Sequence, residues 1–121
     1  MHITLLGQTP SQKNGKQLVT NPKNGRLIPI SNKIVKAWQE DVAIQLRQWK
    51  GQVDNKCTIT YKFYVKDLRR RDLDNMICSV NDALVKAGLL FDDDWQHLAI
   101  GAAEAEYDKL NPRCELWIDE E

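Results

Sequence analysis

The stretch that decides the fold is CTITYKFYV at residues 57–65, a run rich in β-branched and aromatic side chains in which less polar and more polar residues alternate. A period of two is typical of a half-buried β-strand. The run from Met76 to Ala87 instead carries apolar residues three and four positions apart, which predicts one face of a helix. Gly88 follows directly and predicts the helix end. This strand and this helix form the centre of the predicted fold.

Three elements are predicted before this centre, with a long connection after the first. Residues 2–6 predict a short strand, and residues 31–49 predict a helix that Ser31 caps, with Trp38 and Trp49 as core anchors. Residues 7–26 are rich in Gly, Pro, Asn, Ser and Lys and predict a long loop, with turn signals at Asn14-Gly15 and Asn24-Gly25. A short strand or arm is predicted at residues 26–30. A basic loop of this length is either a mobile phosphate clamp or idle, and both interpretations stay open.

After the central helix, residues 98–106 and 114–118 predict two further strands joined by a turn. The apolar face of the first helix is predicted to include Ile34, Val42 and Ile44. Together the elements predict one α+β domain over residues 1–121, with a small mixed sheet of about four strands and two main helices.

Composition and cysteine usage narrow the class of protein. Hydrophobic residues make up 42% and charged residues 28%, which is ordinary for a globular protein. The chain has neither a long apolar run nor a basic leader, so we expect a cytoplasmic protein with no membrane partner. Cys57, Cys78 and Cys114 match no zinc or disulfide pattern, and we expect thiols in or near the core.

Charge is distributed unevenly although its sum is zero. Residues 1–39 hold six Lys or Arg and no acid, whereas residues 91–121 hold ten acids and two bases. Such an asymmetry suggests one face for a polyanion and another for cations or solvent. Chance segregation on a solvated surface is the alternative.

Two acidic clusters suggest chemistry. Residues 69–75 read RRRDLDN, with carboxylates at Asp72 and Asp74 where the helical pattern begins, and residues 92–94 are three consecutive Asp. Crowded carboxylates repel one another, and a divalent cation relieves the repulsion. Neighbouring guanidinium groups bind phosphate well. The pattern favours metal-assisted cleavage of a nucleic-acid backbone, but helix capping by the first pair and an acidic surface loop explain it as well.

Other catalytic schemes have less support. The two histidines, His2 and His97, have no Ser or Cys nucleophile motif beside them, and no Gly-rich phosphate loop is present. We therefore expect no nucleotide cofactor, and any catalysis must be carried by carboxylates.

The chain resembles the RusA family of Holliday-junction resolvases. The resemblance rests on residues 69–75, on NDALVKAG at residues 81–88 and on Asp92-Asp93, and is tight over about residues 66–96. The chain also has the size of that family, and Pro10-Ser11-x-x-Asn14 is similar to its opening loop.

The resemblance implies a homodimeric endonuclease that cuts four-way DNA junctions in recombination or repair, often encoded by a phage or prophage. It implies Mg²⁺ as cofactor, with Mn²⁺ as a substitute. By position, Asp72, Asp74 and Asp93 match the family's essential metal-associated acids, and Asp92 matches an accompanying acid. The family can carry an important lysine where this chain has Cys78, and Lys66 or Lys86 is a candidate substitute.

We expect basic side chains to contact the DNA backbone, because a junction is defined by shape and not by base edges. The expected DNA-binding residues are Arg69, Arg70, Arg71, Lys66, Lys86, Lys13 and Lys16. Two other classes stay open: a non-catalytic, structure-selective DNA-binding protein, and an interaction protein whose charge polarity mediates docking.

Helix geometry raises a question about the expected site. A helix over residues 75–87 is roughly 20 Å long, at about 1.5 Å per residue. Asp72 and Asp74 lie at its start and Asp93 lies beyond its end, so one straight helix cannot bring all three to one ion. Either the helix stops early and the acidic loop folds back, or a twofold dimer supplies the missing acid, which we favour.

Overall fold

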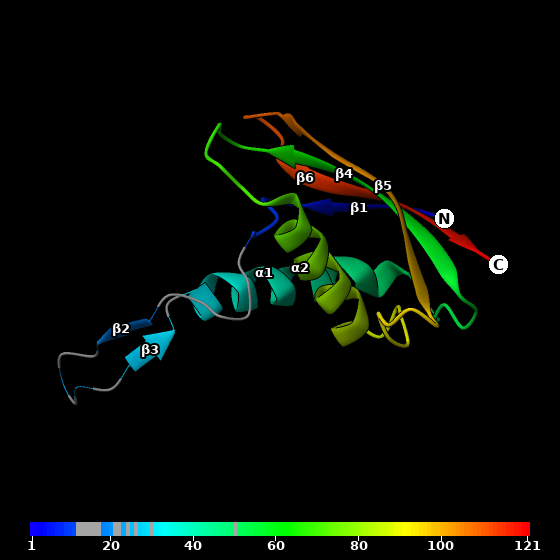
Figure 1. Cartoon of the computed structure of the whole chain (residues 1–121), viewed down its shortest axis with the longest axis horizontal. Coiled ribbons are helices and arrows are strands. Elements are labelled where there is room, and N and C mark those ends of the chain that lie inside the picture. Colours follow the sequence, from blue (N-terminus) through cyan, green and yellow to red (C-terminus); the bar gives the residue numbers. More distant parts are fainter. Residues whose placement is uncertain (12–17, 21–22, 24, 26, 30, 50) are drawn as a thin grey trace.

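The computed structural model describes residues 1–11, 18–20, 23, 25, 27–29, 31–49 and 51–121 (Figure 1). Its main sheet has four strands, in the spatial order β1-β6-β4-β5. These strands are β1 (His2–Leu6), β4 (Cys57–Val65), β5 (Leu98–Tyr107) and β6 (Arg113–Glu120). β6 pairs antiparallel with β1 and β4, whereas β4 and β5 run parallel, so the sheet is mixed.

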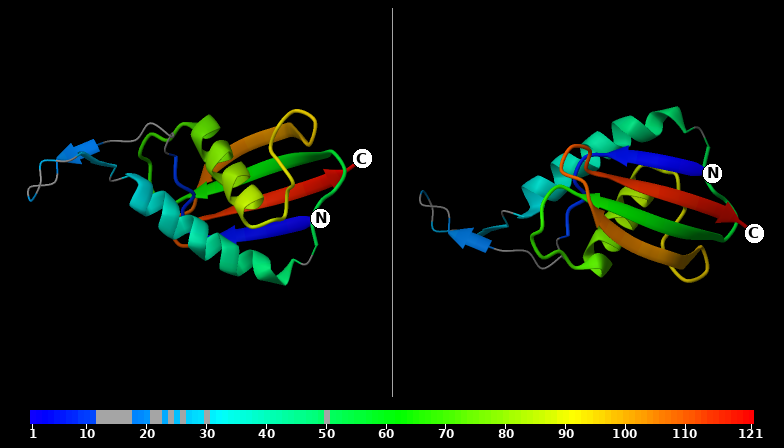
Figure 2. Two further views of the ribbon diagram at one scale, coloured as in Figure 1. Left: turned by 90° about the horizontal axis from the view of Figure 1, so that it is seen from below. Right: turned by 90° about the horizontal axis from the view of Figure 1, so that it is seen from above.

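Two helices, α1 (Ser31–Gln45) and α2 (Leu73–Lys86), cover one face of this sheet (Figure 2). A 3₁₀ turn, η1 (Leu46–Gln48), continues α1. Parallel neighbours need a crossover connection, and α2 provides it between β4 and β5. The expected α+β class, with a small mixed sheet and two main helices, is confirmed. Among the described residues, no helix is long and apolar enough to cross a membrane.

The core lies between the sheet and the helices. Inward positions of β4, from Cys57 through Ile59 and Tyr61 to Phe63, are all buried, and the residues between them are partly exposed. The period of two in the central stretch is therefore realised over its predicted bounds. From the helices, Trp38, Val42, Met76, Val80 and Leu84 join the same hydrophobic cluster.

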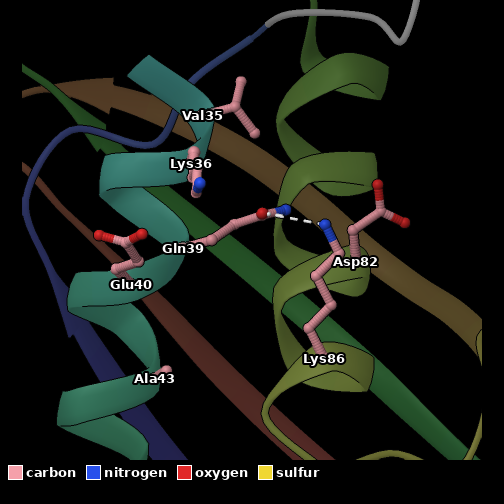
Figure 3. Close-up of a pocket in the computed structure, with 7 residues that line it drawn as sticks. All are labelled: Val35, Lys36, Gln39, Glu40, Ala43, Asp82 and Lys86. Carbon is pink, nitrogen blue, oxygen red and sulfur yellow. Dashed lines mark hydrogen bonds between the residues drawn. The ribbon is translucent and has the colours of Figure 1, made fainter. Parts of the chain in front are cut away.

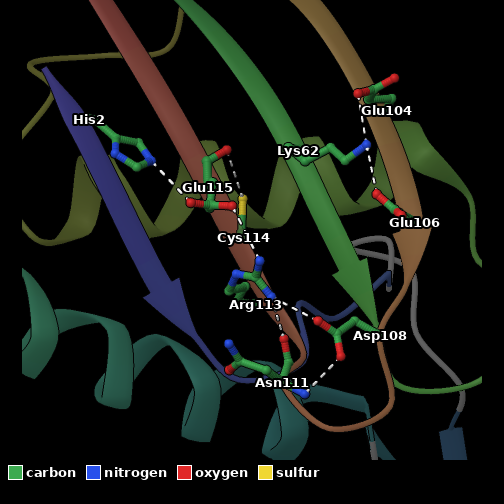
Figure 4. Close-up of polar contacts among 9 residues, drawn as sticks. All are labelled: His2, Lys62, Glu104, Glu106, Asp108, Asn111, Arg113, Cys114 and Glu115. Carbon is green, nitrogen blue, oxygen red and sulfur yellow. Dashed lines mark hydrogen bonds and ion pairs between the residues drawn. The ribbon is translucent and has the colours of Figure 1, made fainter.

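The opposite face of the sheet carries polar contacts between side chains of all four strands (Figure 4). On β4, Lys62 pairs with Glu104 at 2.8 Å and with Glu106 at 3.2 Å, both on β5. On β6, the Arg113 guanidinium lies 3.7 Å from the centre of the Tyr64 ring, which is a cation–π contact. The contacts tie neighbouring strands together on the solvent side.

A small hairpin precedes α1. It pairs β2 (Leu18–Thr20) antiparallel with β3 (Leu27–Pro29). The loop predicted over residues 7–26 is therefore wrong at β2. This strand has only three residues in a segment rich in Asn, Pro and Gly, so it is too short to show a periodic pattern in the sequence. The short strand expected within residues 26–30 is confirmed. The turn expected at Asn14-Gly15 lies outside the described residues.

Two predictions for α1 need correction. The helix ends at Gln45, before the predicted end at Trp49. Ile34 and Ile44, expected on the apolar face, are 56% and 58% exposed. At 100° per residue, Ile44 points away from the side on which Val42 is buried. Trp38 is buried and Trp49 packs against the core at its edge, as expected.

The three thiols differ in surroundings. Cys57 and Cys114 are buried as expected, and burial raises the pKa of both. Cys78 is exposed, so its predicted place in or near the core is wrong. It lies on α2 four residues after Asp74, on the same side of the helix.

Candidate active site

The start of α2 presents two carboxylates to solvent. Asp72 occupies the N-cap position, with its backbone in an extended conformation, and its carbonyl oxygen accepts the N–H groups of Asn75 and Met76. Its carboxylate makes no capping hydrogen bond. Instead it lies 3.4 Å from the Arg70 guanidinium and accepts the Asn75 side-chain amide at 3.4 Å. Capping by the backbone alone leaves the carboxylate available for a ligand.

Asp74 follows in the first turn of α2 and is exposed. Asn75, which directly follows Asp74, is buried, and its carbonyl oxygen accepts the Ser79 hydroxyl at 3.0 Å. Asn75 thus anchors the Asp72 carboxylate to the helix. Its position in RRRDLDN indicated a motif, but its orienting role appears only from the packing.

The loop between β4 and α2 holds its three arginines differently. Arg69 and Arg70 have side chains 85% and 91% exposed. Arg71 is 12% exposed, and its guanidinium donates to the Asp67 carboxylate at 2.7 Å and to the Asp67 and Arg69 carbonyl oxygens. Hydrogen bonding to Arg71 lowers the pKa of Asp67. Arg71 therefore braces the loop, while Arg69 and Arg70 extend from it.

The acids of the loop after α2 also differ in their contacts. Asp94 pairs with the His97 ring, and its carbonyl oxygen accepts the backbone N–H of His97 and of Leu98. The His97 contact lowers the pKa of Asp94. Asp94 thus closes the turn into β5.

Asp93 is partly removed from water and lies near other carboxylates. Partial loss of hydration raises its pKa, and the nearby carboxylates of Asp82 and Asp92 raise it further. Asp92 also accepts the backbone N–H of Asp93 at 2.7 Å. These are hard oxygen donors in mutual repulsion, which is the chemistry that Mg²⁺ or Mn²⁺ suits. Among the described residues, the donor chemistry therefore fits a divalent cation, but no three of these side chains lie close enough together to hold one.

Asp82 was not among the predicted site residues. It lies on α2 eight residues after Asp74, so the two acids share one side of the helix about 12 Å apart along its axis. That spacing was visible in the sequence. The approach of Asp93 to Asp82 was not, because it depends on how the acidic loop packs.

The structure keeps the predicted acids in two groups. Helix α2 runs without interruption to Lys86, so the early helix end considered above is wrong. Asp72 and Asp74 lie at its start, whereas Asp93 lies beside Asp82 in its second half. Within the described part of the chain, no three His, Cys, Asp or Glu side chains lie close enough together to hold one metal ion.

The predicted lysines are spread over the molecule. Lys66 is exposed just after β4, and its backbone N–H is donated to the Gln8 side chain at 2.8 Å. Lys86 donates to the Gln39 side chain at 3.1 Å across a groove of about 550 Å³ between α1 and α2 (Figure 3). Asp82 lines the same groove. Lys13 and Lys16 lie outside the described residues.

Two carboxylates and two exposed guanidinium groups thus lie together at the start of α2, and guanidinium groups are well suited to binding phosphate. The family model described as Endodeoxyribonuclease RusA matches residues 8–119 of the 121-residue chain. The chain belongs to this family of Holliday-junction-resolving endonucleases. The comparison with curated protein sequences gives no significant match.

Proposed function

We propose that this protein is a homodimeric, divalent-metal-dependent endodeoxyribonuclease that resolves four-way DNA junctions by hydrolysing backbone phosphodiesters. Membership of the RusA family supports the substrate class. The observation that carries the proposal is the start of α2, where Asp72 leaves its carboxylate unused for capping beside the exposed Arg70.

In this proposal Asp72, Asp74 and Asp93 hold Mg²⁺, with Mn²⁺ as a substitute. When bound, the cation would polarise the scissile phosphate and lower the pKa of an attacking water. Asn75 orients Asp72 through its side-chain amide, and the Arg70 guanidinium balances the charge of that carboxylate until a phosphate arrives. The protein thus prepares a site for a phosphodiester before the DNA binds.

Arg69 and Arg70 bind phosphates on either side of the scissile bond. Their exposure supports this role, because an extended guanidinium reaches two phosphate oxygens at once. Arg71 fixes the loop from which they extend. Neither group reads a base, so selectivity for a junction comes from the positions at which two such loops meet the backbone.

The test is cleavage of a synthetic four-way junction and of a matched linear duplex, with Mg²⁺, with Mn²⁺ and with a chelator. We expect paired nicks in the junction strands only when Mg²⁺ or Mn²⁺ is present. The Asp72→Asn protein is the matched control, because it should bind the junction without cutting it. Tight binding with no cleavage in either metal would instead identify a non-catalytic junction-binding protein.

A further inference from the structure

The main sheet has one face that the two helices leave open. Figure 2 shows α1 and α2 together on one side of the sheet, and the other side is the outer face. Gln45 fixes α1 to the sheet, because its side chain accepts the Leu6 N–H at 2.7 Å and donates to the Leu6 carbonyl at 3.1 Å. Since β4 buries every second side chain, the residues between them point to the outer face, and these are Thr58, Thr60, Lys62 and Tyr64.

Carboxylates outnumber cations on the outer face. Each of its two cations is shared by two acids, and the groups are Lys62 with Glu104 and Glu106, and Arg113 with Asp108 and Glu115 (Figure 4). With His2 neutral, four carboxylates against two cations leave two negative charges in excess. Such a surface repels phosphate and attracts a positively charged partner. Part of the acidic surplus of residues 91–121 is thus displayed away from the helices.

A hollow of about 320 Å³ lies in the outer face beside Trp117. In the sheet, Trp117 of β6 has His2 of β1 on one side and Thr60 of β4 on the other. The His2 ring stacks on the indole, with 4.8 Å between the ring centroids and 9° between the planes. Thr60 and Ala102 line the hollow and are small. One face of the indole is therefore covered by His2, and the other borders the hollow.

A carboxylate lines the same hollow. The Glu104 side chain is 70% exposed, and Lys62 contacts its Oε1 atom at 2.8 Å. The second oxygen, Oε2, can accept hydrogen bonds from a ligand. A guanidinium group stacks on an aromatic ring and donates its N–H groups to a carboxylate. The hollow therefore combines the two groups that bind an arginine side chain.

The outer face already binds one arginine of this chain in that way. The Arg113 guanidinium lies 3.7 Å from the centre of the Tyr64 ring and donates to Asp108 at 3.0 Å. Beside Trp117 the ring and the carboxylate are present, but no arginine is among the described residues that line the hollow. The missing guanidinium would have to come from another molecule.

We propose that the outer face docks a basic segment of another protein, with one arginine stacked on Trp117 and paired with Glu104. The excess of carboxylates supplies the attraction, and the hollow selects a guanidinium side chain. A DNA strand is the disfavoured occupant, because the same carboxylates repel its phosphates.

The test is an NMR titration of the full-length protein with a Gly–Arg–Gly–Arg–Gly peptide whose ends are blocked. The signal of the Trp117 indole N–H, assigned by its loss in Trp117→Leu, should shift and saturate as peptide is added. The matched peptide carries citrulline in place of each arginine. It should leave the signal unchanged, because the citrulline side chain is neutral.

Two protein variants separate the hollow from general charge attraction. Glu104→Gln should weaken binding of the arginine peptide about threefold, as expected for loss of an exposed ion pair. Glu40→Gln removes the same charge from an exposed position on α1, on the other side of the sheet, and should leave the affinity unchanged. Equal weakening by both variants would overturn the proposal.

Two further outcomes would overturn it. Trp95 is 77% exposed and directly follows the three consecutive Asp, so a shift of its indole signal with none at Trp117 would place peptide binding on the wrong surface. A shift of the Trp117 signal by single-stranded oligothymidine, with none by the peptide, would make the outer face a DNA-binding surface instead. No readout involves junction cleavage, so the result is independent of the proposed function.

Discussion

At the scale of single residues, the acids of this protein differ in the side chains that surround them. Asp67 is bound by Arg71 and Asp94 by His97, and both have a lowered pKa for that reason. Asp93 has a raised pKa, because burial removes part of its hydration and its neighbours are other carboxylates. Asp67 and Asp94 are thus held by basic partners that are themselves largely covered, whereas Asp93 is crowded by acids and is available to a cation.

We expect Asp72→Asn, Asp74→Asn and Asp93→Asn each to abolish junction cleavage while binding stays intact or tightens. Loss of a ligand removes the chemistry, and loss of negative charge eases the approach of DNA. A loss of about 4 kcal/mol of transition-state stabilisation corresponds to roughly a thousandfold in rate. Nicking and gel-shift assays measure both quantities, with Asp54→Asn as an exposed control acid. An acid whose variant still cuts at the normal rate does not belong to the site.

The buried pair of Tyr61 and Asn81 provides a test of stability. The Tyr61 hydroxyl donates to the Asn81 side chain at 2.6 Å, between β4 and α2. Asn81→Ala leaves the hydroxyl buried without its acceptor, so the free energy of unfolding should fall by about 1–3 kcal/mol. Denaturant unfolding measures it. In Tyr61→Phe/Asn81→Ala neither partner is left unpaired, and this variant should recover part of the loss. A double variant less stable than Asn81→Ala would contradict the assignment.

At the scale of elements, the loop between β4 and α2 divides its arginines between binding and support. Arg69→Gln and Arg70→Gln should each lower the slope of log K against log salt by roughly 0.9, because each removes one phosphate contact. Arg71→Gln should chiefly lower the melting temperature, since it releases the loop from Asp67. Fluorescence titrations at several salt concentrations check the slopes. Equal slope changes for all three variants would show that Arg71 also binds phosphate.

The Asp67–Arg71 pair also predicts a pH dependence. The folded-state pKa of Asp67 is lowered, so its contribution to stability is present above the unfolded pKa of about 4 and is lost as the pH falls through the folded value. The difference in melting temperature between wild type and Asp67→Asn should be full at pH 7 and vanish in acid. A scan of melting temperature from pH 7 to pH 2 measures it. A difference that grows in acid would contradict the assignment.

How much of the structure can be predicted from the sequence depends on whether each interaction is local in the chain or arises from tertiary packing. The strand Cys57–Val65 and the helix start at Asp72 were predictable, because alternation and capping are local. The brace between Arg71 and Asp67 was not, since identical arginines in a row carry no sign of which one folds back. The approach of Asp93 to Asp82 likewise depends on loop packing, and the open edge of β5 depends on strand order.

At the scale of the whole molecule, the separation of the acids along α2 predicts complementation between subunits. Asp72→Asn and Asp93→Asn proteins are each expected to be inactive. In a mixed dimer with shared sites, one site carries both lesions and the other is intact, so nicking should partly return. Cleavage by the mixture, with heterodimers verified by two different tags, is the measurement. No recovery although heterodimers form would mean that each site is built within one chain.

The two hydrogen bonds between Gln45 of α1 and Leu6 of β1 have a consequence for association through the sheet. Strand-by-strand assembly grows without limit when both margins of a sheet accept a neighbour, and the product is a fibre. Gln45 occupies the N–H and C=O of Leu6, so an added strand cannot pair with β1 at that residue. A single glutamine on α1 thus hinders growth at this end of the sheet.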